Sequence, residues 1–353
     1  MAKVSHFRYA LRFLFTIGFY CCCLLATGQT LGGGAGFNFL SFSSTATATA
    51  AGGMNVSYAS GDAGFTFQNS ALMQPSHHGQ LSMHFTSLPA GVKALHLGGA
   101  YQHQKWNATL GGHVFLIHYG SIEQRDAAGN VSGNFQAYDY VIQLGGAKKY
   151  LARWQYGGAL KWIQSFYGPY QSSALALDVG LLYADSLSGF RAGLVAKNMG
   201  VQIKKFSDRG EDLPFDLQFG VTKRLLQAPL AFSLTAHHLH RFNLLYNDTT
   251  FNNANNVEAS NSFFKNIFNH LVFAGHVYLG QHLEATVGYN FLRRSELSFG
   301  NGGNGLTGFS AGLSAKFQKL QIHFSRATYA KGIGYNQLGL QLNMPQLGGG
   351  GKF

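Results

Sequence analysis

Apolar and polar side chains alternate along most of the chain, from about residue 79 to residue 344. In the first such stretch Leu81, Met83 and Phe85 alternate with a serine, a histidine and a threonine. A period of two places one class of side chain on each face of a β-strand. The pattern predicts about fourteen strands, most of them about ten residues long, which is the length that a tilted membrane strand needs. We expect them at 79–87, 93–104, 105–119, 134–149, 153–167, 172–184, 189–198, 214–223, 229–239, 268–279, 281–292, 306–317, 319–328 and 335–344.

The connections between these strands alternate in length. After even-numbered strands they are short, whereas several that follow odd-numbered strands are long and polar, at 121–134, 200–214, 241–264 and 293–305. Short turns on one side and long loops on the other are typical of outer-membrane barrels. The fold class that we predict is all-β, a transmembrane antiparallel β-barrel with its long loops outside the cell. A soluble secreted β-protein is the alternative, but it would not need this alternation.

Composition and the first residues favour an exported membrane protein. Charged residues make up only 11% of the chain, against about 25% in soluble domains. Residues 1–28 are predicted to be a signal peptide, since basic residues precede an apolar core at 13–25 that is too short to span a membrane. Its end, Ala26 to Gly28, offers the small residues that cleavage needs. All three cysteines lie inside this segment, so the mature chain would have no disulfide and no thiolate metal site.

The segment between the signal peptide and the first strand, 29–78, is rich in small residues and almost free of charge. Such a segment packs closely inside another structure but cannot form a core of its own. We therefore expect 29–78 to be an N-terminal plug, or hatch, in a barrel formed by 79–344. Residues 345–353 would form a C-terminal tail.

Few residues suggest chemistry. His237, His238 and His240 are the nearest approach to a metal site, but His238 and His240 alone share a strand face, and the next acidic residue along the chain is Asp248. Histidines that face the lumen or the rim are the simpler interpretation, so no metal is expected. The glycine runs lack the strand–loop–helix setting of a phosphate loop. No pair of groups suited to general acid–base catalysis stands out, so neither an enzyme nor a cofactor is predicted.

The formal net charge is +12. A basic surface suits nucleic acid or anionic lipid, and export argues against nucleic acid. A possible binding rim for anions or for a partner contains Lys204, Lys205 and Arg209 in one outer loop and Arg293 and Arg294 at the start of another. The phosphates or carboxylates of a surface glycolipid such as lipopolysaccharide are its expected ligands, although charge at a barrel rim is also ordinary.

The plug carries a family resemblance. A Phe-Leu phrase (Phe39, Leu40), a run that ends in Gly52 and Gly53, and the phrase Gln68, Asn69, Ser70, Ala71, Leu72 together resemble the amino-terminal region of the PorQ family. That family belongs to the type IX secretion system and, with PorV, to barrels related to FadL-type fatty acid transporters. Ala51 and Ser70 depart from its pattern, where Leu and Pro are usual. PorV is the alternative within this relationship.

The resemblance implies a non-enzymatic outer-membrane scaffold with a FadL-like barrel. Its partners would be the proteins of the attachment complex, namely a PorZ-like surface protein, the sortase-like PorU and PorV, and it would serve the linkage of secreted cargo to lipopolysaccharide. The loop 241–264 would then be the docking surface. The alternative function is a FadL-like transporter for hydrophobic small molecules, and a general porin is a further one.

Overall fold

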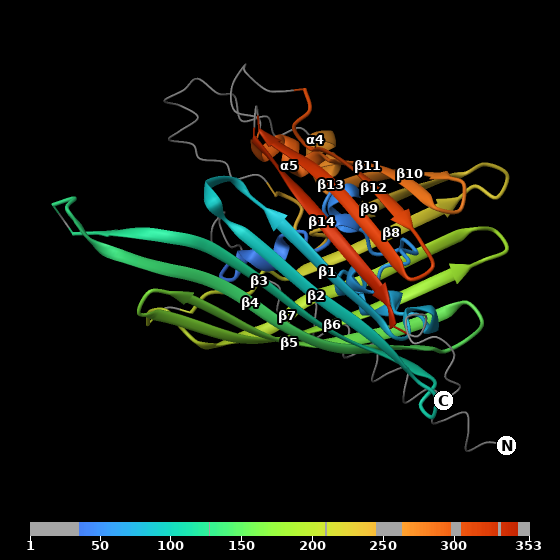
Figure 1. Ribbon diagram of the computed structural model, residues 1–353, viewed down its shortest axis with the longest axis horizontal. Helices are drawn as coiled ribbons and strands as arrows, with labels where there is room; N and C mark the ends of the chain where they lie inside the picture. Colours follow the sequence, from blue (N-terminus) through green and yellow to red (C-terminus); the bar gives the residue numbers. More distant parts are fainter. Residues whose placement is uncertain are drawn as a thin grey trace. The chain divides into compact units, whose positions relative to one another are not determined.

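Fourteen antiparallel β-strands form one closed barrel in the part of the chain that the structure, a computed structural model, describes (Figure 1). The described residues are 35–126, 128–208, 210–244, 263–297, 305–330 and 333–344. Each strand pairs with its neighbours along the chain, and β14 (Ile333–Asn343) closes the barrel against β1 (Gln80–Ser87). This confirms the predicted fold class. The predicted signal peptide and C-terminal tail lie outside the described residues.

The strand bounds lie close to those predicted from the alternation, and the largest differences are that the third strand runs on to Arg125 and the seventh to Lys204. The remaining strands are β2 (Lys93–His103), β3 (Ala108–Arg125), β4 (Val131–Lys149), β5 (Trp154–Tyr167), β6 (Tyr170–Asp185), β7 (Phe190–Lys204), β8 (Asp216–Arg224), β9 (Leu230–Ala236), β10 (Leu271–Leu279), β11 (Leu283–Asn290), β12 (Phe309–Lys316) and β13 (Leu320–Ala330).

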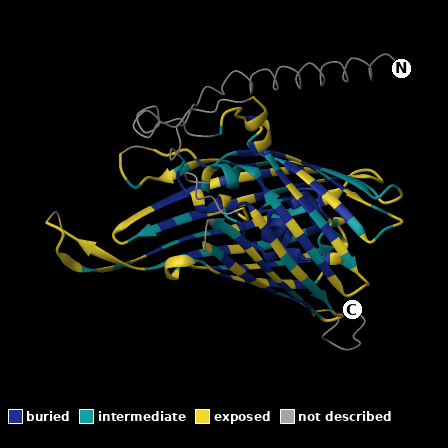
Figure 2. Ribbon diagram, turned by 90° about the horizontal axis from the view of Figure 1, so that it is seen from above, coloured by how far each residue is buried: buried dark blue, intermediate teal, exposed yellow. Residues whose placement is uncertain are grey.

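Burial alternates along the strands, which gives the wall its chequered appearance in Figure 2. The outward face is apolar, as at Leu97, Leu144 and Leu160, whereas the inward face is polar or small, as at His96, Gln143 and Lys161. The apolar outward side chains can face lipid. A closed barrel also pairs the backbone amide and carbonyl groups, to which lipid offers no hydrogen bonds. Among the described residues, no helix is both long and apolar enough to cross a membrane.

Strands extend into two of the predicted outer loops. Pairing of β3 with β4 continues to Arg125 and Val131, although β2 leaves β3 at His118 and β5 leaves β4 at Ala137. The segment predicted as the loop 121–134 is therefore a hairpin that pairs only with itself and projects beyond the wall (Figure 1). The alternation of apolar and polar residues is missing here, because both faces of a strand outside the bilayer meet water. The sequence pattern therefore did not predict this part of the two strands. In the same way, β7 runs on to Lys204 within the predicted loop 200–214.

Residues 35–79, which we call the hatch, lie inside the barrel. The hatch is built from short helices, namely η1 (Asn38–Ser41), α2 (Ala46–Ala50), η2 (Ala63–Phe67), η3 (Ser70–Leu72) and η4 (Pro75–His77). Thr45 caps α2 by accepting a hydrogen bond from the Ala48 amide, and Gly52 and Gly53, both at positive φ, end it. Further helices lie in the long connections, α4 (Phe263–Asn269) before β10 and α5 (Phe291–Leu297) after β11.

The hatch lies directly against inward-facing glycines of the wall. We call these the lumen glycines, and they are Gly157, Gly180, Gly193, Gly220, Gly288 and Gly312. A Cβ added to Gly157 would lie 2.5 Å from the Ala71 amide nitrogen, and one added to Gly288 would lie 2.6 Å from the Ala50 carbonyl oxygen. These neighbours are backbone atoms, which cannot rotate away. A side chain at these positions would therefore push the hatch off the wall.

We expect Gly288→Ala to lower the free energy of unfolding by about 1–3 kcal/mol, the usual cost of overpacking a close contact. Gly275→Ala on the neighbouring strand β10 is the matched control, because its Cβ would meet the Phe232 ring at an ordinary 3.8 Å. Denaturant unfolding in detergent, followed by the mobility difference between unheated and boiled samples on a gel, measures both. Equal stability of the two variants would contradict the close packing of hatch and wall.

Candidate functional site

Polar side chains on the lumen wall satisfy the backbone of the hatch. The Gln337 amide donates to the Ser44 carbonyl at 2.9 Å and accepts from the Thr49 hydroxyl at 2.6 Å, and the Gln341 amide donates to the Gly61 carbonyl at 2.9 Å. An irregular segment has many backbone groups without partners of its own, and leaving them buried and unpaired is costly. The polar lumen therefore substitutes for water around the hatch.

Asp62 joins the middle of the hatch to β1. Its carboxylate accepts hydrogen bonds from the Ser82 hydroxyl at 2.7 Å and from the Gly64 amide at 2.8 Å, and one oxygen lies 3.1 Å from Nε2 of His84. Burial by itself raises the pKa of Asp62, but the His84 imidazole and the Ser82 hydroxyl hold it well below its usual range. Because the folded pKa is depressed, this ionisation stabilises the protein above the ordinary carboxyl pKa, and the stabilisation is lost as the pH falls towards the folded value.

A buried ion pair joins the neighbouring strands β5 and β6 on the lumen face of the wall. Lys161 Nζ lies 2.6 Å from an Asp178 carboxylate oxygen and donates to the Asn198 side chain at 2.8 Å. The backbone amide of Asn198 in turn donates to Asp178 at 2.7 Å, and Lys161 Nζ also lies 5.3 Å from the centre of the Phe67 ring in the hatch. Sequence reasoning missed this pair, since two charges on different strands reveal nothing until their register is known.

One part of the lumen is apolar. Phe115, Val141 and Ile163 face inwards from β3, β4 and β5, and with their apolar neighbours they form what we call the apolar compartment. Phe39 and Leu40 of the hatch fill it and are 6% and 4% exposed, and the Phe39 and Phe115 rings lie 6.3 Å apart. Most other inward positions in the described barrel are polar or small, so this compartment stands out.

The hatch motif that the sequence singled out is buried throughout. Besides Phe39 and Leu40, Gly52 and Gly53 end helix α2 at positive φ. Gln68 ends η2, and Asn69 caps η3 by accepting from the Ala71 amide at 2.9 Å. Ser70, Ala71 and Leu72 form η3 itself, against Gly157 and Gly180 of the wall. The Ser70 hydroxyl, where the resembling family has a proline, makes no hydrogen bond to the described residues.

The predicted basic rim does not form a single set. Lys204 ends β7 and Lys205 follows it, both exposed, and Arg209 lies outside the described residues. Arg293 was wrongly placed at the rim, because helix α5 turns it inwards. It is buried, donates to the Gly52 carbonyl at 3.1 Å and covers the Tyr329 ring at 4.9 Å. Arg294 is half-buried and donates to the Gly305 carbonyl at 3.2 Å.

The histidine run also differs from expectation. Strand β9 ends at Ala236, so His238 and His240 do not share a strand face. The acidic group that the sequence lacked nearby is Asp216, the first residue of the adjacent strand β8, and it lies beside His237 and His238. Asp216 is far from these histidines along the sequence, so the sequence alone offered no reason to associate them.

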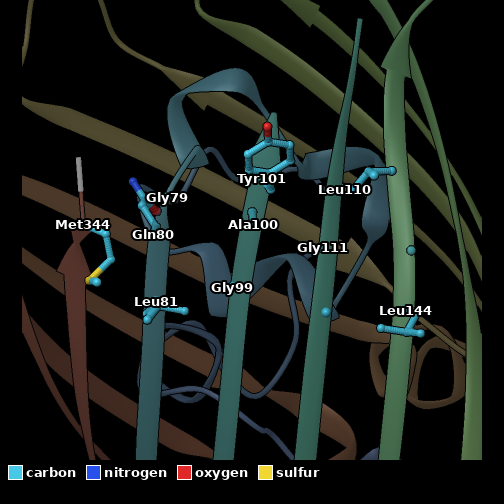
Figure 3. A pocket seen from close by; sticks show the side chains of 12 residues that line it. Gly79, Gln80, Leu81, Gly99, Ala100, Tyr101, Leu110, Gly111, Leu144 and Met344 are labelled. Carbon is cyan, nitrogen blue, oxygen red and sulfur yellow. The ribbon is translucent and has the colours of Figure 1, made fainter. Parts of the chain in front are cut away.

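The described residues also form a groove on the outer wall and a cavity at one end of the barrel. A groove of about 710 Å³ lies on the outside of β1 to β4, and its lining includes Gly99 and Gly112. The side chains of Leu81, Tyr101 and Leu144 line it from three different strands (Figure 3). A cavity of about 580 Å³ lies at the short-turn end of the barrel. Arg191, which lines it, has two guanidinium nitrogens buried without a hydrogen-bond partner among the described residues.

Comparison with known proteins identifies the fold. No protein-family model and no curated protein matches the chain. Among solved structures, the CymD monoaromatic hydrocarbon channel superposes with a TM-score of 0.52 at 12% identity, over 85% of this chain and 96% of that one. The chain has the same barrel fold as this channel. A TodX monoaromatic hydrocarbon channel mutant (deltaS2S3) matches with a TM-score of 0.45 at 10% identity, over 85% and 98%, and the KdgM porin with 0.33 at 5%, over 74% and 98%.

The superposition on CymD shows that the chain shares the barrel fold of that channel. At such low identity the likeness extends to the fold alone. The chemistry of the lumen therefore has to come from the residues of this chain.

We expect Lys161→Met to lower the free energy of unfolding by about 3–5 kcal/mol, because it leaves Asp178 buried without its partner. The double variant Lys161→Met with Asp178→Leu should regain much of that loss, and Lys148→Met, at an exposed outward position, should change little. Denaturant titration in detergent gives all three values. A double variant no more stable than the single one would contradict the assignment of the loss to the unpaired carboxylate.

Proposed function

We propose that the chain is an outer-membrane channel for hydrophobic small molecules, held closed by its hatch. The observation that carries this proposal is the apolar compartment inside an otherwise polar lumen. Phe115, Val141 and Ile163 form an apolar surface that a water-filled pore would not need. The compartment has the chemistry of a hydrophobic ligand site, and in the closed state residues of the hatch fill it in place of a ligand.

The part of the hatch that fills the compartment is also its most weakly tied part. Within the described residues, no hydrogen bond joins 37–42 to a strand, and the bonds of η1 stay inside the turn, from Leu40 to Phe37 and from Phe42 to Phe39. By contrast, Asp62, Thr49 and Ala50 each hydrogen-bond to side chains of the wall. Withdrawal of η1 would break apolar packing alone, and an incoming hydrophobic molecule would restore that packing.

The fold likeness supports the same class of function. CymD, which superposes with a TM-score of 0.52, is described as a monoaromatic hydrocarbon channel. A barrel of this fold with an apolar compartment agrees with passage of compounds of low polarity rather than with passage of ions.

Uptake of labelled toluene tests the proposal in a host that lacks its own channels for aromatic hydrocarbons. Expression of the chain should raise the initial uptake rate several-fold over an empty vector. Phe39→Ala with Leu40→Ala should raise it further, since the compartment is then no longer filled. Phe85→Ala, a phenylalanine on the outward face of β1, is the control and should match the parent chain.

Uptake equal to that of the empty vector, from a barrel that shows the usual gel shift on heating, would overturn the channel proposal. A double variant that transports no faster than the parent would place the ligand elsewhere than in the apolar compartment.

A second candidate function is a scaffold in the type IX secretion system, which rests on two features. One is the resemblance of the hatch motif to the PorQ family. The other is the β3–β4 hairpin, because beyond His118 and Ala137 its strands pair only with each other. Its free edges offer backbone groups to which a strand of a PorZ-like surface protein could add. The loop 241–264 that the sequence suggested for docking lies mostly outside the described residues.

Affinity purification in mild detergent tests the scaffold. Replacement of 122–135 by an Asn-Gly turn should abolish co-purification of a large surface protein and leave the heat-modifiable barrel intact. A chain with two glycines inserted in the turn at 104–107, at the opposite end, should still capture the partner. Failure of the unmodified chain to bring down a partner, with cargo still attached to lipopolysaccharide in a deletion strain, would contradict the scaffold and leave the channel proposal standing.

A further inference from the structure

The end of β9 brings two consecutive histidines together. The strand stops at Ala236, and His238 has a positive φ of 53°, which turns the backbone sharply. Successive side chains of an extended strand point to opposite faces, but this turn places both imidazoles on one side. As a result, Nδ1 of His237 lies 2.5 Å from Nδ1 of His238, and the ring planes stand at 73°.

Asp216 completes the cluster from the neighbouring strand. One of its carboxylate oxygens accepts from the His238 amide at 2.6 Å, and the other accepts from the Gln218 side chain at 2.6 Å. Both bonds orient the carboxylate towards the imidazoles. One ligand atom from each of Asp216, His237 and His238 lies within 4.8 Å of the other two.

We propose that Asp216, His237 and His238 bind a divalent metal ion of the zinc type, through the carboxylate and the two Nδ1 atoms. Two imidazoles and one carboxylate are a donor set for zinc and similar ions, and they leave positions open for water. At zinc–nitrogen distances near 2.0–2.1 Å, two nitrogens of a tetrahedral site lie about 3.3 Å apart. The rings therefore have to separate by less than an ångström, which small side-chain rotations provide.

Charges around the cluster bear on its affinity for a cation. The nearby positive charges, Lys197 on β7 and Arg241 beyond β9, oppose a cation. Asp216 is the carboxylate that faces the imidazoles, and its single negative charge is set against these two positive charges. We therefore expect the affinity for the metal ion to be moderate rather than very tight.

There is room for the water that would complete the coordination shell. A cavity of about 30 Å³ adjoins the cluster and is lined by Asp216, Gln218 and His238 together with Lys197 and hatch residues such as Gln68. A space of this size with several polar walls holds one or two water molecules. The cavity also connects the proposed ion to the hatch.

Further groups hold the ligands in position. His270, which follows helix α4, places Nδ1 2.7 Å from the His237 carbonyl, and the His237 amide donates to the His270 carbonyl at 2.9 Å. Nε2 of His270 lies 3.1 Å from the Phe242 carbonyl, so this ring is engaged on both sides and is not a ligand. Such outer contacts orient metal ligands in known sites. The ion would join β8 to both ends of the long β9–β10 connection.

The test uses the full chain in detergent, purified without a polyhistidine tag and treated with a chelator. Titration with Co²⁺ at neutral pH should give one equivalent of bound ion, with visible absorption bands of nitrogen and oxygen ligation, and Zn²⁺ should displace it. His237→Gln and Asp216→Asn should each weaken binding by at least about tenfold. His282→Gln, an exposed histidine in the β10–β11 turn, is the matched control and should bind like the parent.

Gel mobility before and after heating verifies that each variant is folded. Asparagine has nearly the same size and shape as aspartate, so Asp216→Asn removes the charge with little effect on the packing of the wall. Unchanged affinity in both His237→Gln and Asp216→Asn would overturn the proposal. Absence of one-to-one binding to the parent chain at millimolar Co²⁺ or Zn²⁺ would overturn it equally.

Discussion

The structure depends on how closely an irregular peptide can approach a β-sheet. At the lumen glycines the backbone of the hatch occupies the space where side chains would stand, as at Gly288 beside Ala50. Between these positions, side chains such as Gln337 and Asn290 bond to the hatch backbone. Close approach and polar satisfaction need each other, because a buried backbone without partners would be expelled. The small residues of the hatch permit the close approach, and the polar lumen supplies the hydrogen bonds that this approach requires.

The same constraint distinguishes the two proposed functions. Where the hatch is hydrogen-bonded to the wall, as at Asp62, it has the character of a fixed plug. Where it rests on apolar packing, as at Phe39, it can be replaced by anything of similar shape and polarity. A scaffold would use the first property and a channel the second. Both can belong to one molecule, since they occupy different parts of the hatch.

The barrel was predictable because lipid imposes a period of two on every strand that it touches, as at Leu81, Met83 and Phe85. That signal fails where the strands leave the bilayer, so the hairpin around Arg125 was taken for a loop. The functional details were less accessible. Asp216 and His237 meet only through the pairing of β8 with β9, and Arg293 turns inwards only because a helix follows β11. The paired glycines at 157–158 were a usable signal, since Gly157 faces the hatch.

The path of the hatch has a consequence for assembly. At Gly36 it bonds to Asp212 in the β7–β8 connection, on the long-loop side, and at Gly79 it bonds to Met344 and Ala100 on the short-turn side. It therefore passes through the ring of strands from one mouth to the other. A peptide so enclosed could not easily be threaded through a finished cylinder with a filled lumen. The seam between β1 and β14 would have to join last, with the amino-terminal segment already inside. During biogenesis the strands would then close around the hatch that precedes them in the chain.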